Sequence, residues 1–312
     1  MVKIGIIGLG HMGNYHASAC TLAQNIKLVA VADPNEENFK KIKTDNIIKS
    51  TSYKDWIDMV DAVIIAVPTE YHHQIAKDCL QKNKHVLVEK PITKTLDQAI
   101  ELFQIAEEKN LALHIGHVER FNGAVQELKK IINDPYLIEC HRIGPFAARV
   151  QNDSVVLDLM IHDIDLVLNI VNSKISTSEI VSRKIKSNLA DIAVAQVKFE
   201  NGVLANITSS RASQIKERTM CIHQKDAFIK LDFTTQDIFI HRHTSDSVIV
   251  GNNQLQYKQE AMIERLFVFK DNPLKQEIEY FANSIKSGKQ LNNAKNDIAA
   301  LELTLKLDSL VK

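Results

Sequence analysis

Residues 3–17, KIGIIGLGHMGNYHA, decide the fold of this chain, because an apolar run ends at glycines and continues as a helix. Residues 3–7 are expected to form a buried strand, and Gly8, Gly10 and Gly13 follow in the G-x-G-x-x-G spacing. Gly8 turns the chain, Gly10 lets bare backbone approach a pyrophosphate, and Gly13 lets the helix lie close to the strand. The helix N-terminus offers unpaired N–H groups to an anion. The stretch therefore predicts a nucleotide-phosphate site.

A carboxylate after the second expected strand strengthens this prediction. Residues 27–32 (KLVAVA) form that strand, and Asp33 ends it, twenty residues beyond Gly13. A carboxylate there accepts hydrogen bonds from the adenosine ribose hydroxyls and repels a 2′-phosphate, so the expected cofactor is NAD rather than NADP. The alternative interpretation is a structural glycine loop followed by a turn at Asp33 and Pro34.

The composition is that of a globular protein with two domains. The chain has 312 residues, of which 45% are hydrophobic and 24% charged, and its formal net charge is zero. This length exceeds one ordinary domain of about 150 residues. The zero net charge gives no electrostatic argument for nucleic acid or an acidic membrane, so neither is expected as a partner.

The cysteines and the N-terminus predict a cytoplasmic protein. The four cysteines lie far apart and form no CxxC pair, which is typical of buried thiols in a reducing compartment. The apolar N-terminal run is short and broken by glycines, unlike a signal peptide. No apolar run approaches the ~20 residues that cross a bilayer.

Residues 1–120 alternate between strand and helix patterns. Near-continuous apolar strands between amphipathic helices predict a parallel sheet covered on both faces. This is the doubly wound class, in which ligands lie beyond the carboxyl ends of the strands. Strands are expected at residues 3–7, 27–32, 62–67, 86–88 and 111–116, and helices at 70–83 and 96–110.

The alternation stops after GHVERFN at residues 116–122. Consecutive strands with alternating polarity follow, and helical patterns surround them. The sequence therefore predicts a first domain over residues 1–120 and a second over residues 121–312, with a mainly antiparallel sheet backed by helices. Its strands are expected at 136–143, 193–199, 203–207, 219–233 and 237–241, and its helices up to 133, at 155–171 and from 276 to 312.

Three ionisable residues share one side of the apolar helix expected over residues 155–171. Asp158, His162 and Asp165 are spaced by four and three residues, which places them on one helix face. An unpaired buried charge is too costly, so this stripe must be paired or face a polar cavity. His162, with a carboxylate one turn away on each side, suits a proton acceptor. The alternatives are a satisfied core network and a metal site, and no metal is assigned because these three residues would need further ligands.

Glu89, Lys90 and Pro91 follow the strand expected at residues 86–88. In a doubly wound sheet this edge faces the nicotinamide side, so Lys90 is expected to point at the reacting atoms. Its ammonium can hydrogen-bond a substrate oxygen, stabilise a developing alkoxide, or act as a base after losing a proton. The alternative is a solvated lysine at a strand end.

Further polar residues near the expected sheet edges are ligand candidates. Arginines near GHVERFN and before the polar helix suit a carboxylate or a diphosphate, although surface arginines are common. A histidine after the strand at 62–67 lines the cofactor cleft or merely begins a helix. These residues are Arg120, Asn122, Arg142, Arg149 and His72.

Together these motifs resemble the Gfo/Idh/MocA oxidoreductases over essentially the full chain. The matching pieces are GLGHMGNYH, Asp33, AVPTEYHH, VEKP, GHVERFN and the D-x-x-x-H-x-x-D of residues 158–165. The resemblance implies a Rossmann domain and an α/β domain with an open, largely antiparallel sheet for substrate binding and dimer or tetramer contacts. It also implies that Lys90, Asp158 and His162 converge on the substrate carbinol beside the nicotinamide.

Within this family, residues 142–165 with GHVERFN are most similar to the bacterial UDP-N-acetylglucosamine 3-dehydrogenases. Those enzymes oxidise the sugar 3-hydroxyl to a ketone, which an aminotransferase converts to an amine on the route to lipid A. The resemblance thus implies a UDP-sugar substrate, a homodimer or homotetramer, and an aminotransferase as pathway partner. The alternatives are a dehydrogenase of a free polyol such as inositol and a non-catalytic dinucleotide-binding sensor.

The resemblance assigns a role to each candidate residue. His162 removes the hydroxyl proton, Lys90 holds the oxygen and Asp158 orients the pair, while the choice of His162 or Lys90 as base stays open. Substrate contacts are assigned to these three residues with Arg120, Asn122 and Arg149. Cofactor contacts are assigned to Gly8, Gly10, His11, Met12, Gly13, Asp33, Pro68, Thr69, His72, Glu89 and Lys90.

Overall fold

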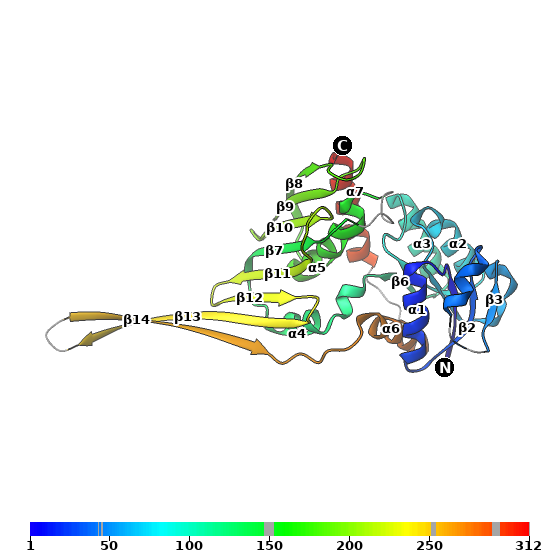
Figure 1. The fold of residues 1–312 in the computed structure, drawn as a ribbon, viewed down its shortest axis with the longest axis horizontal. Coiled ribbons are helices and arrows are strands. Elements are labelled where there is room, and N and C mark those ends of the chain that lie inside the picture. Colours follow the sequence, from blue (N-terminus) through cyan, green and yellow to red (C-terminus); the bar gives the residue numbers. More distant parts are fainter. Residues whose placement is uncertain (43, 45, 147–152, 251–253, 289–293, 312) are drawn as a thin grey trace. The chain divides into compact units, whose positions relative to one another are not determined.

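The computed structural model describes the chain except residues 43, 45, 147–152, 251–253, 289–293 and 312 (Figure 1). It separates into two compact units. Unit 1 comprises Met1–Phe121 with Asp271–Leu305, and unit 2 comprises Asn122–Lys270 with Lys306–Lys312.

Unit 1 is a doubly wound sheet. Within the described part of the chain it holds six parallel strands in the order β3-β2-β1-β4-β5-β6. This order places the first βα turn at the point where strand order reverses, which is where such folds bind dinucleotides. The strands are β1 (Val2–Ile7), β2 (Ile26–Ala32), β3 (Ile48–Ser50), β4 (Ala62–Ile65), β5 (His85–Glu89) and β6 (Leu113–Gly116).

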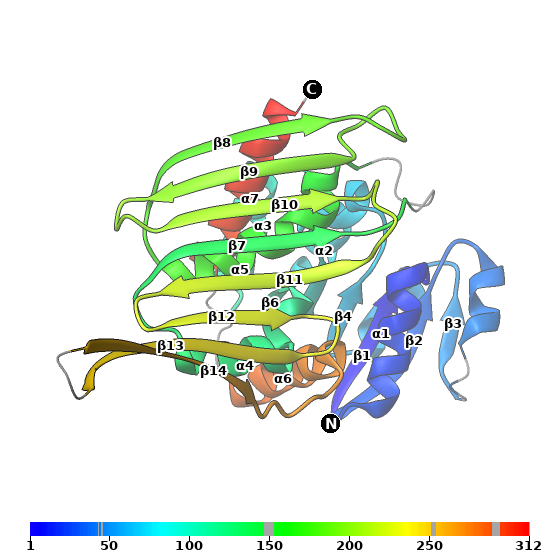
Figure 2. The same ribbon diagram turned by 60° about the vertical axis from the view of Figure 1, so that its left-hand side comes forward.

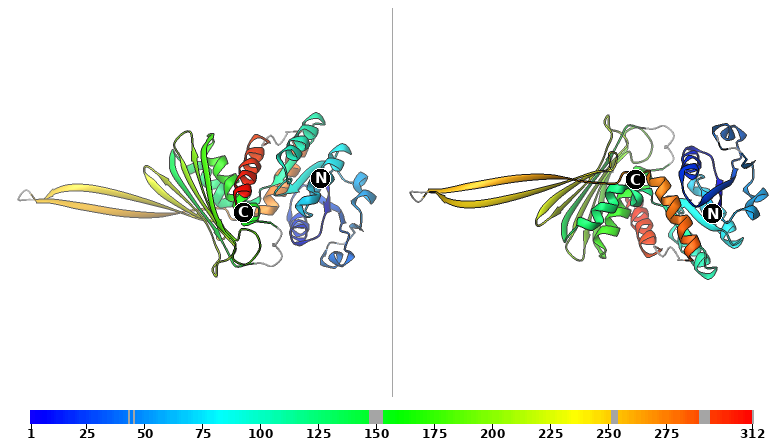
Figure 3. Two further views of the ribbon diagram at one scale, coloured as in Figure 1. Left: turned by 90° about the horizontal axis from the view of Figure 1, so that it is seen from above. Right: turned by 90° about the horizontal axis from the view of Figure 1, so that it is seen from below.

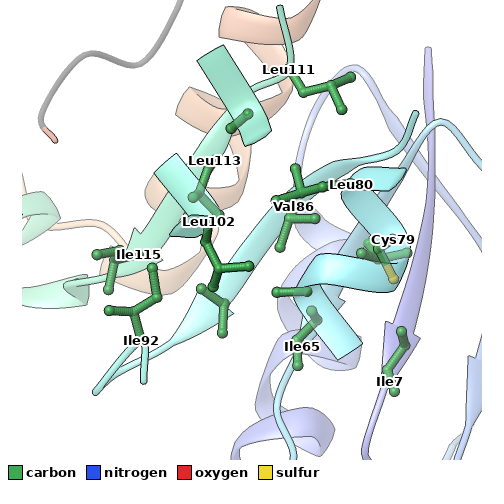
Figure 4. Packing of buried hydrophobic residues seen from close by; sticks show 14 of the residues in the cluster. Ile7, Ile65, Cys79, Leu80, Val86, Ile92, Leu102, Leu111, Leu113 and Ile115 are labelled. Atoms are coloured by element: carbon green, nitrogen blue, oxygen red, sulfur yellow. The ribbon is translucent and has the colours of Figure 1, made fainter. Parts of the chain in front are cut away.

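Helices cover both faces of this sheet because successive strand residues point to opposite sides. In β4, Val63 and Ile65 pack with α2 and α3 in one cluster, whereas Ala62 and Ile64 pack in the other. Figure 4 shows the first cluster, with Ile65 beside Cys79 and Leu80 of α2. The unit's helices are α1 (His11–Leu22), α2 (His72–Gln81), α3 (Leu96–Glu108) and α6 (Pro273–Ser287), and α7 (Ala294–Leu310) begins in it.

The helix α6 packs in unit 1, although it lies far along the chain. It falls in the second domain predicted over residues 121–312, whereas its contacts place it in unit 1. Its apolar face, formed by Leu274, Ile278 and Phe281, is buried against the cluster that contains Ile4 and Ile6 of β1. Only the folded chain reveals which sheet an amphipathic helix covers.

Unit 2 is built on a mixed, mainly antiparallel sheet. Its described residues form eight strands in the order β14-β13-β12-β11-β7-β10-β9-β8 (Figure 2). The β10–β7 pair is parallel, and the other neighbouring pairs are antiparallel. The strands are β7 (Pro135–Ile143), β8 (Ile175–Arg183), β9 (Ile192–Phe199), β10 (Leu204–Ser210), β11 (Glu217–Gln224), β12 (Ala227–Asp232), β13 (Asp237–Val250) and β14 (Gln254–Leu266).

Helices cover one face of this sheet, and the other face is open. Ile138, Cys140 and Ile207 point toward the helices and are fully buried, whereas Tyr136 and Leu204 on the opposite face are 57% and 46% exposed. The covering helices include α4 (Gly123–Ile131), a π-helical turn (Val156–Met160) and α5 (Ile161–Val171). The predicted fold class, a Rossmann domain plus an α+β domain with an open sheet, is confirmed.

Three parts of the second sheet were not predicted: β8, the far end of β13 and the whole of β14. Strand β8 is mostly exposed and polar, so it lacks the apolar signal of a buried strand. Strand β13 was expected only over residues 237–241, where it pairs with β12. It continues to Val250 and pairs there with β14 alone, as a two-stranded hairpin (Figure 3).

The four cysteines are free thiols, and three of them are buried. Burial raises the pKa of Cys20 and of Cys79 to about 12, which keeps these thiols protonated and unreactive. Among the described residues, the helices are too short or too polar to span a lipid bilayer.

Candidate active site

The glycine turn after β1 has the shape that a pyrophosphate needs. Gly8 has a φ of +90°, and a Cβ there would lie 2.6 Å from the Ala66 carbonyl oxygen. A Cβ on Gly13 would lie 1.9 Å from the Gly8 carbonyl oxygen. Among the described residues, nothing lies within 4 Å of a Cβ placed on Gly10. Two glycines are thus required by the fold, while the third leaves open space at the start of α1.

Asp33 is fixed beside this turn. Its Oδ2 accepts a hydrogen bond from the Leu9 backbone N–H at 2.7 Å, and its Oδ1 accepts one from Asn35 at 2.8 Å. The carboxylate is 7% exposed and ends β2. Each carboxylate oxygen has a second acceptor site, so Asp33 can still receive ribose hydroxyls. The turn and this carboxylate fit the pyrophosphate and adenosine ribose of NAD.

The other predicted cofactor residues follow the carboxyl ends of the same parallel strands. His11 and Met12 begin α1, and the exposed His11 ring packs edge-on to Tyr15 at 4.6 Å. Pro68 and Thr69 follow β4, with Pro68 exposed and Thr69 half-buried. These residues lie where a doubly wound sheet binds its ligand.

Lys90 follows β5 and is half-buried, and its peptide bond to Pro91 is cis. Glu89 and His72 were assigned to the cofactor, but the structure gives both side chains internal partners. The Glu89 Oε1 lies 2.7 Å from His16 Nε2, and the His72 ring nitrogens each lie 2.9 Å from a backbone carbonyl oxygen. Their exposed fractions are 7% and 1%, which is typical of structural groups.

The predicted substrate residues of GHVERFN also form interactions inside their own units. In unit 1, the buried Arg120 forms an ion pair with Asp297. In unit 2, Asn122 accepts a hydrogen bond from Ala124 at the start of α4 and donates one to the Phe233 carbonyl oxygen at 3.0 Å. These bonds give both side chains a structural role. Arg149 lies outside the described residues.

The polar helix of unit 2 begins with a π-helical turn, where a regular helix was predicted. Asp158 lies in this turn, at Val156–Met160, and His162 lies in the first turn of α5. Both side chains are half-buried, whereas Asp165 is buried and accepts a hydrogen bond from Asn169. A π turn changes the helical phase, and such turns often occur at functional sites.

Arg142 forms a buried ion pair within unit 2. It is 2% exposed and forms a bidentate ion pair with Asp163, from Nε to Oδ2 at 2.9 Å and from Nη2 to Oδ1 at 2.8 Å. Its guanidinium also lies 5.0 Å from the centre of the Phe233 ring. Asp163 was not predicted, although a charge on the apolar side of this helix implies a buried partner.

A pocket of about 250 Å³ opens beside Asp158 in unit 2. Four of its side chains are cationic and one is a carboxylate. Such a pocket can take up a phosphate or diphosphate through charge-assisted hydrogen bonds. Its lining comprises Arg142, Ile143, Gly144, Pro145, Asp158, Leu159, Ser210, Arg211, Lys216 and Arg218.

Arg211 is held in the pocket wall by Asp191. Its Nε donates to Asp191 Oδ1 at 2.9 Å, and its Nη1 donates to the Asp153 carbonyl oxygen at 2.7 Å. Burial raises the pKa of Asp191, but hydrogen bonds from backbone N–H groups and from Arg211 outweigh it and hold this pKa well below its usual value. No sequence motif points to this pair, because the two residues are joined only by the fold.

Lys216 and Arg218 were also missed. Lys216 directly precedes β11 and Arg218 is its second residue, and side chains two residues apart in extended chain share one face. Lys216 is exposed and Arg218 is half-buried. Two cations at this spacing were the sequence signal that could have indicated an anion-binding face.

Two family models match the chain. Residues 2–117 match the oxidoreductase family with an NAD-binding Rossmann fold. Residues 123–230 match the GFO/IDH/MocA C-terminal domain.

Curated relatives match most of the chain. UDP-N-acetylglucosamine 3-dehydrogenase of Acidithiobacillus ferrooxidans is 31% identical over 286 residues, which cover 91% of this chain and 88% of the relative. Glucose-6-phosphate 3-dehydrogenase of Bacillus subtilis is 31% identical, with 68% and 69% covered. Myo-inositol 2-dehydrogenase of Thermotoga maritima is 24% identical, with 92% and 89% covered. A solved structure of the Acidithiobacillus enzyme superimposes with a TM-score of 0.88 at 29% identity, covering 99% and 97% of the two chains.

Proposed function

The chain belongs to the Gfo/Idh/MocA oxidoreductases, and from this premise we propose that it oxidises the 3-hydroxyl of UDP-N-acetylglucosamine to a ketone. Its first unit is an NAD-binding Rossmann domain. The observation that carries the choice of substrate is the cationic pocket beside Asp158.

The charge of the pocket favours a phosphate-bearing sugar over a neutral polyol. Arg142 pairs with Asp163 and Arg211 pairs with Asp191, so these two arginines mainly form the pocket wall and add little net charge to it. Lys216 and the half-buried Arg218 add positive charge at the same wall. Cations there stabilise a diphosphate through charge-assisted hydrogen bonds, and a neutral polyol has no charge to match them.

The catalytic roles follow from the chemistry of three side chains. His162 removes the proton of the sugar hydroxyl, since a neutral imidazole is a suitable base near neutral pH. Lys90 donates a hydrogen bond to the same oxygen and stabilises its developing negative charge. Asp158 orients these groups. NAD, when bound, supplies the acceptor for the hydride.

The NAD site uses the open face of the glycine turn. Backbone N–H groups at the start of α1 hold the pyrophosphate, and the lack of a side chain on Gly10 allows its close approach. Asp33 accepts hydrogen bonds from the ribose hydroxyls and disfavours a 2′-phosphate. The side chains of His11, Met12, Pro68 and Thr69 line the same sheet edge.

The second candidate function is a dehydrogenase of a free polyol. The relation to myo-inositol 2-dehydrogenase, over 92% of this chain, favours it. An assay of reduced-nicotinamide absorbance with UDP-N-acetylglucosamine, glucose 6-phosphate and myo-inositol separates the candidates. We expect turnover with the UDP-sugar. Turnover with glucose 6-phosphate alone would keep the cationic pocket as the phosphate site and change the sugar, and turnover with myo-inositol alone would overturn the proposal.

We also infer a homodimer or homotetramer, whose ketone product would be consumed by an aminotransferase. The hairpin of β13 and β14 supports self-association, because it extends beyond β12 as two strands. An isolated two-stranded hairpin is marginally stable in water. Light scattering with size-exclusion chromatography tests this inference, and a monomer at micromolar concentration would contradict it.

A further inference from the structure

We propose that His16 and His72 are positioning residues, which hold the chain on both sides of Lys90 and so fix the direction of its side chain. The proposal rests on the catalytic role proposed above for Lys90. We call His16, Glu89 and His72 the histidine clamp. All of its contacts lie within unit 1.

The first half of the clamp holds the residue before Lys90. His16 lies in α1, three residues after the last glycine of the turn, and is fully buried. Its Nε2 lies 2.7 Å from Oε1 of Glu89, the last residue of β5. This bond ties the helix that begins at the phosphate site to the strand end from which Lys90 projects.

The second half holds the residue after Lys90. His72 begins α2 and is 1% exposed. Its Nδ1 lies 2.9 Å from the carbonyl oxygen of Pro91, and its Nε2 lies 2.9 Å from that of Val67. A neutral imidazole donates only one of these two hydrogen bonds. The neutral His72 ring therefore donates to one of these carbonyl oxygens and packs against the other, between the chain that follows β4 and the chain that follows β5.

The charge state of the clamp keeps Glu89 ionised. Burial raises the pKa of Glu89, but the hydrogen bond from His16 and the charge of Lys90 outweigh it, so this pKa lies below its usual value. Space for the carboxylate is left by Gly116 on β6, where a Cβ would lie only 3.2 Å from Glu89 Oε2. The carboxylate is thus enclosed between α1 and β6.

Packing alone does not explain this arrangement. A buried ionisable pair costs desolvation, and apolar residues of similar size are often at least as stable. In addition, the Nδ1 of His16 has no hydrogen-bond partner among the described residues, which adds to the cost of burying this ring. A role in holding the chain beside Lys90 explains why a histidine stands at this position.

The test compares His16→Ala with a matched control on α2. His73→Ala is the control, because His73 also pairs with a glutamate, at 2.6 Å from Glu101, and is partly exposed. His16→Gln is the conservative variant, since its amide can still donate to Glu89. Steady-state kinetics are measured with NAD and UDP-N-acetylglucosamine, and NAD affinity is measured by calorimetry.

A second readout needs no substrate. Limiting acetic anhydride labels the lysines, and mass spectrometry compares Lys90 with the exposed Lys94 as internal reference. In His16→Ala the released Glu89 carboxylate is free to pair with Lys90. We therefore expect the labelling ratio of Lys90 to Lys94 to fall about threefold or more.

The expected kinetic result is a fall in kcat of about 100-fold for His16→Ala, with NAD affinity within about threefold and recovery in His16→Gln. The control His73→Ala leaves both readouts unchanged.

A folded His16→Ala protein with wild-type kcat and labelling ratio would overturn the proposal. If His16→Ala does not fold, Glu89→Ala takes its place, because it also removes the bond between α1 and the end of β5; a wild-type kcat in that variant would overturn the proposal. A changed labelling ratio in a protein inactive on every substrate would uphold the clamp and reject the proposed function.

Discussion

Arg142 on β7 and Asp163 on α5 form a buried bidentate ion pair, with hydrogen bonds of 2.9 and 2.8 Å. Their side chains are 3% and 1% exposed. The pair anchors α5 to β7 at Asp163, which directly follows His162 in the helix. It therefore restricts the rotation of α5 and the direction of the neighbouring His162 side chain.

Breaking this pair should destabilise the protein strongly. Asp163→Ala leaves the Arg142 guanidinium buried without its carboxylate, which costs about 3–5 kcal/mol. Urea unfolding followed by circular dichroism measures the change. The control is Glu37→Ala, which removes an exposed pair with Lys40 and should cost less than about 1 kcal/mol. Equal effects of the two variants would show that the Arg142 pair is not stabilising.

Two alanine substitutions in the glycine turn should have different consequences. Gly13→Ala forces a contact of 1.9 Å with the Gly8 carbonyl oxygen, so α1 must move and the unfolding midpoint should fall. Gly10→Ala meets open space and should keep the wild-type midpoint, while NAD affinity falls about tenfold or more because the methyl group blocks the pyrophosphate. Urea unfolding and calorimetry with NAD check both outcomes. Unchanged NAD affinity in Gly10→Ala would contradict the proposed cofactor position.

The parallel sheet of unit 1 can be predicted from sequence because its signals are local. A strand such as β4 is apolar at every position, and Gly8, Gly10 and Gly13 follow β1 at a fixed spacing. Each of these features depends on a few neighbouring residues. The same holds for Lys90 at the end of its strand.

Pairs that join distant residues could not be predicted in this way. Arg142 was expected to bind a ligand because its sequence neighbourhood does not reveal Asp163. The partner of Arg120 was missed for the same reason, since Asp297 is 177 residues away. The helix α6 was not assigned to unit 1, because its amphipathic pattern does not say which sheet it covers.

Loss of either proposed catalytic group should abolish turnover and spare cofactor binding. Lys90→Met and His162→Asn should each lower kcat about 100-fold to 10,000-fold, because each removes a proton-transfer or charge-stabilising group. NAD affinity should stay within about threefold, which calorimetry tests. Wild-type kcat in either variant would remove that residue from the mechanism.

Asp191 should make stability depend on pH in the acid range. Its pKa is lowered from 3.8 in the folded chain, so the unfolded chain binds more protons as the pH falls through that value. Stability from this group is therefore present above about pH 4 and is lost on acidification. Urea unfolding at about pH 7 and pH 3 should show a smaller difference for Asp191→Asn than for wild type.

Asp308 offers a control of opposite sign for that experiment. Burial raises the pKa of Asp308, so this group favours the folded chain more at low pH than at neutral pH. Asp308→Asn should therefore widen the difference between the two pH values. Identical pH dependence in both variants and wild type would contradict the assigned shifts.

Lys216 and Arg218 of the pocket should select for phosphate. Lys216→Ala and Arg218→Ala each remove a charge from the wall beside Asp158, so each should raise KM for UDP-N-acetylglucosamine about tenfold. kcat and the KM for NAD should not change, because neither side chain belongs to the NAD site. Lys230→Ala is the matched control, since Lys230 is an exposed cation on the neighbouring strand β12.

The dependence of KM on salt concentration is a second measurement of phosphate binding by Lys216 and Arg218. Binding of a diphosphate by exposed cations weakens as ionic strength rises, so the KM of wild type should increase with added salt. The two pocket variants should show a smaller increase, because they have fewer charges to screen. A salt response equal to wild type, together with an unchanged KM, would show that the diphosphate does not enter this pocket. In that case the choice between a UDP-sugar and a neutral polyol would lose its structural support, while the dehydrogenase chemistry assigned to Lys90 and His162 would still stand on its own test.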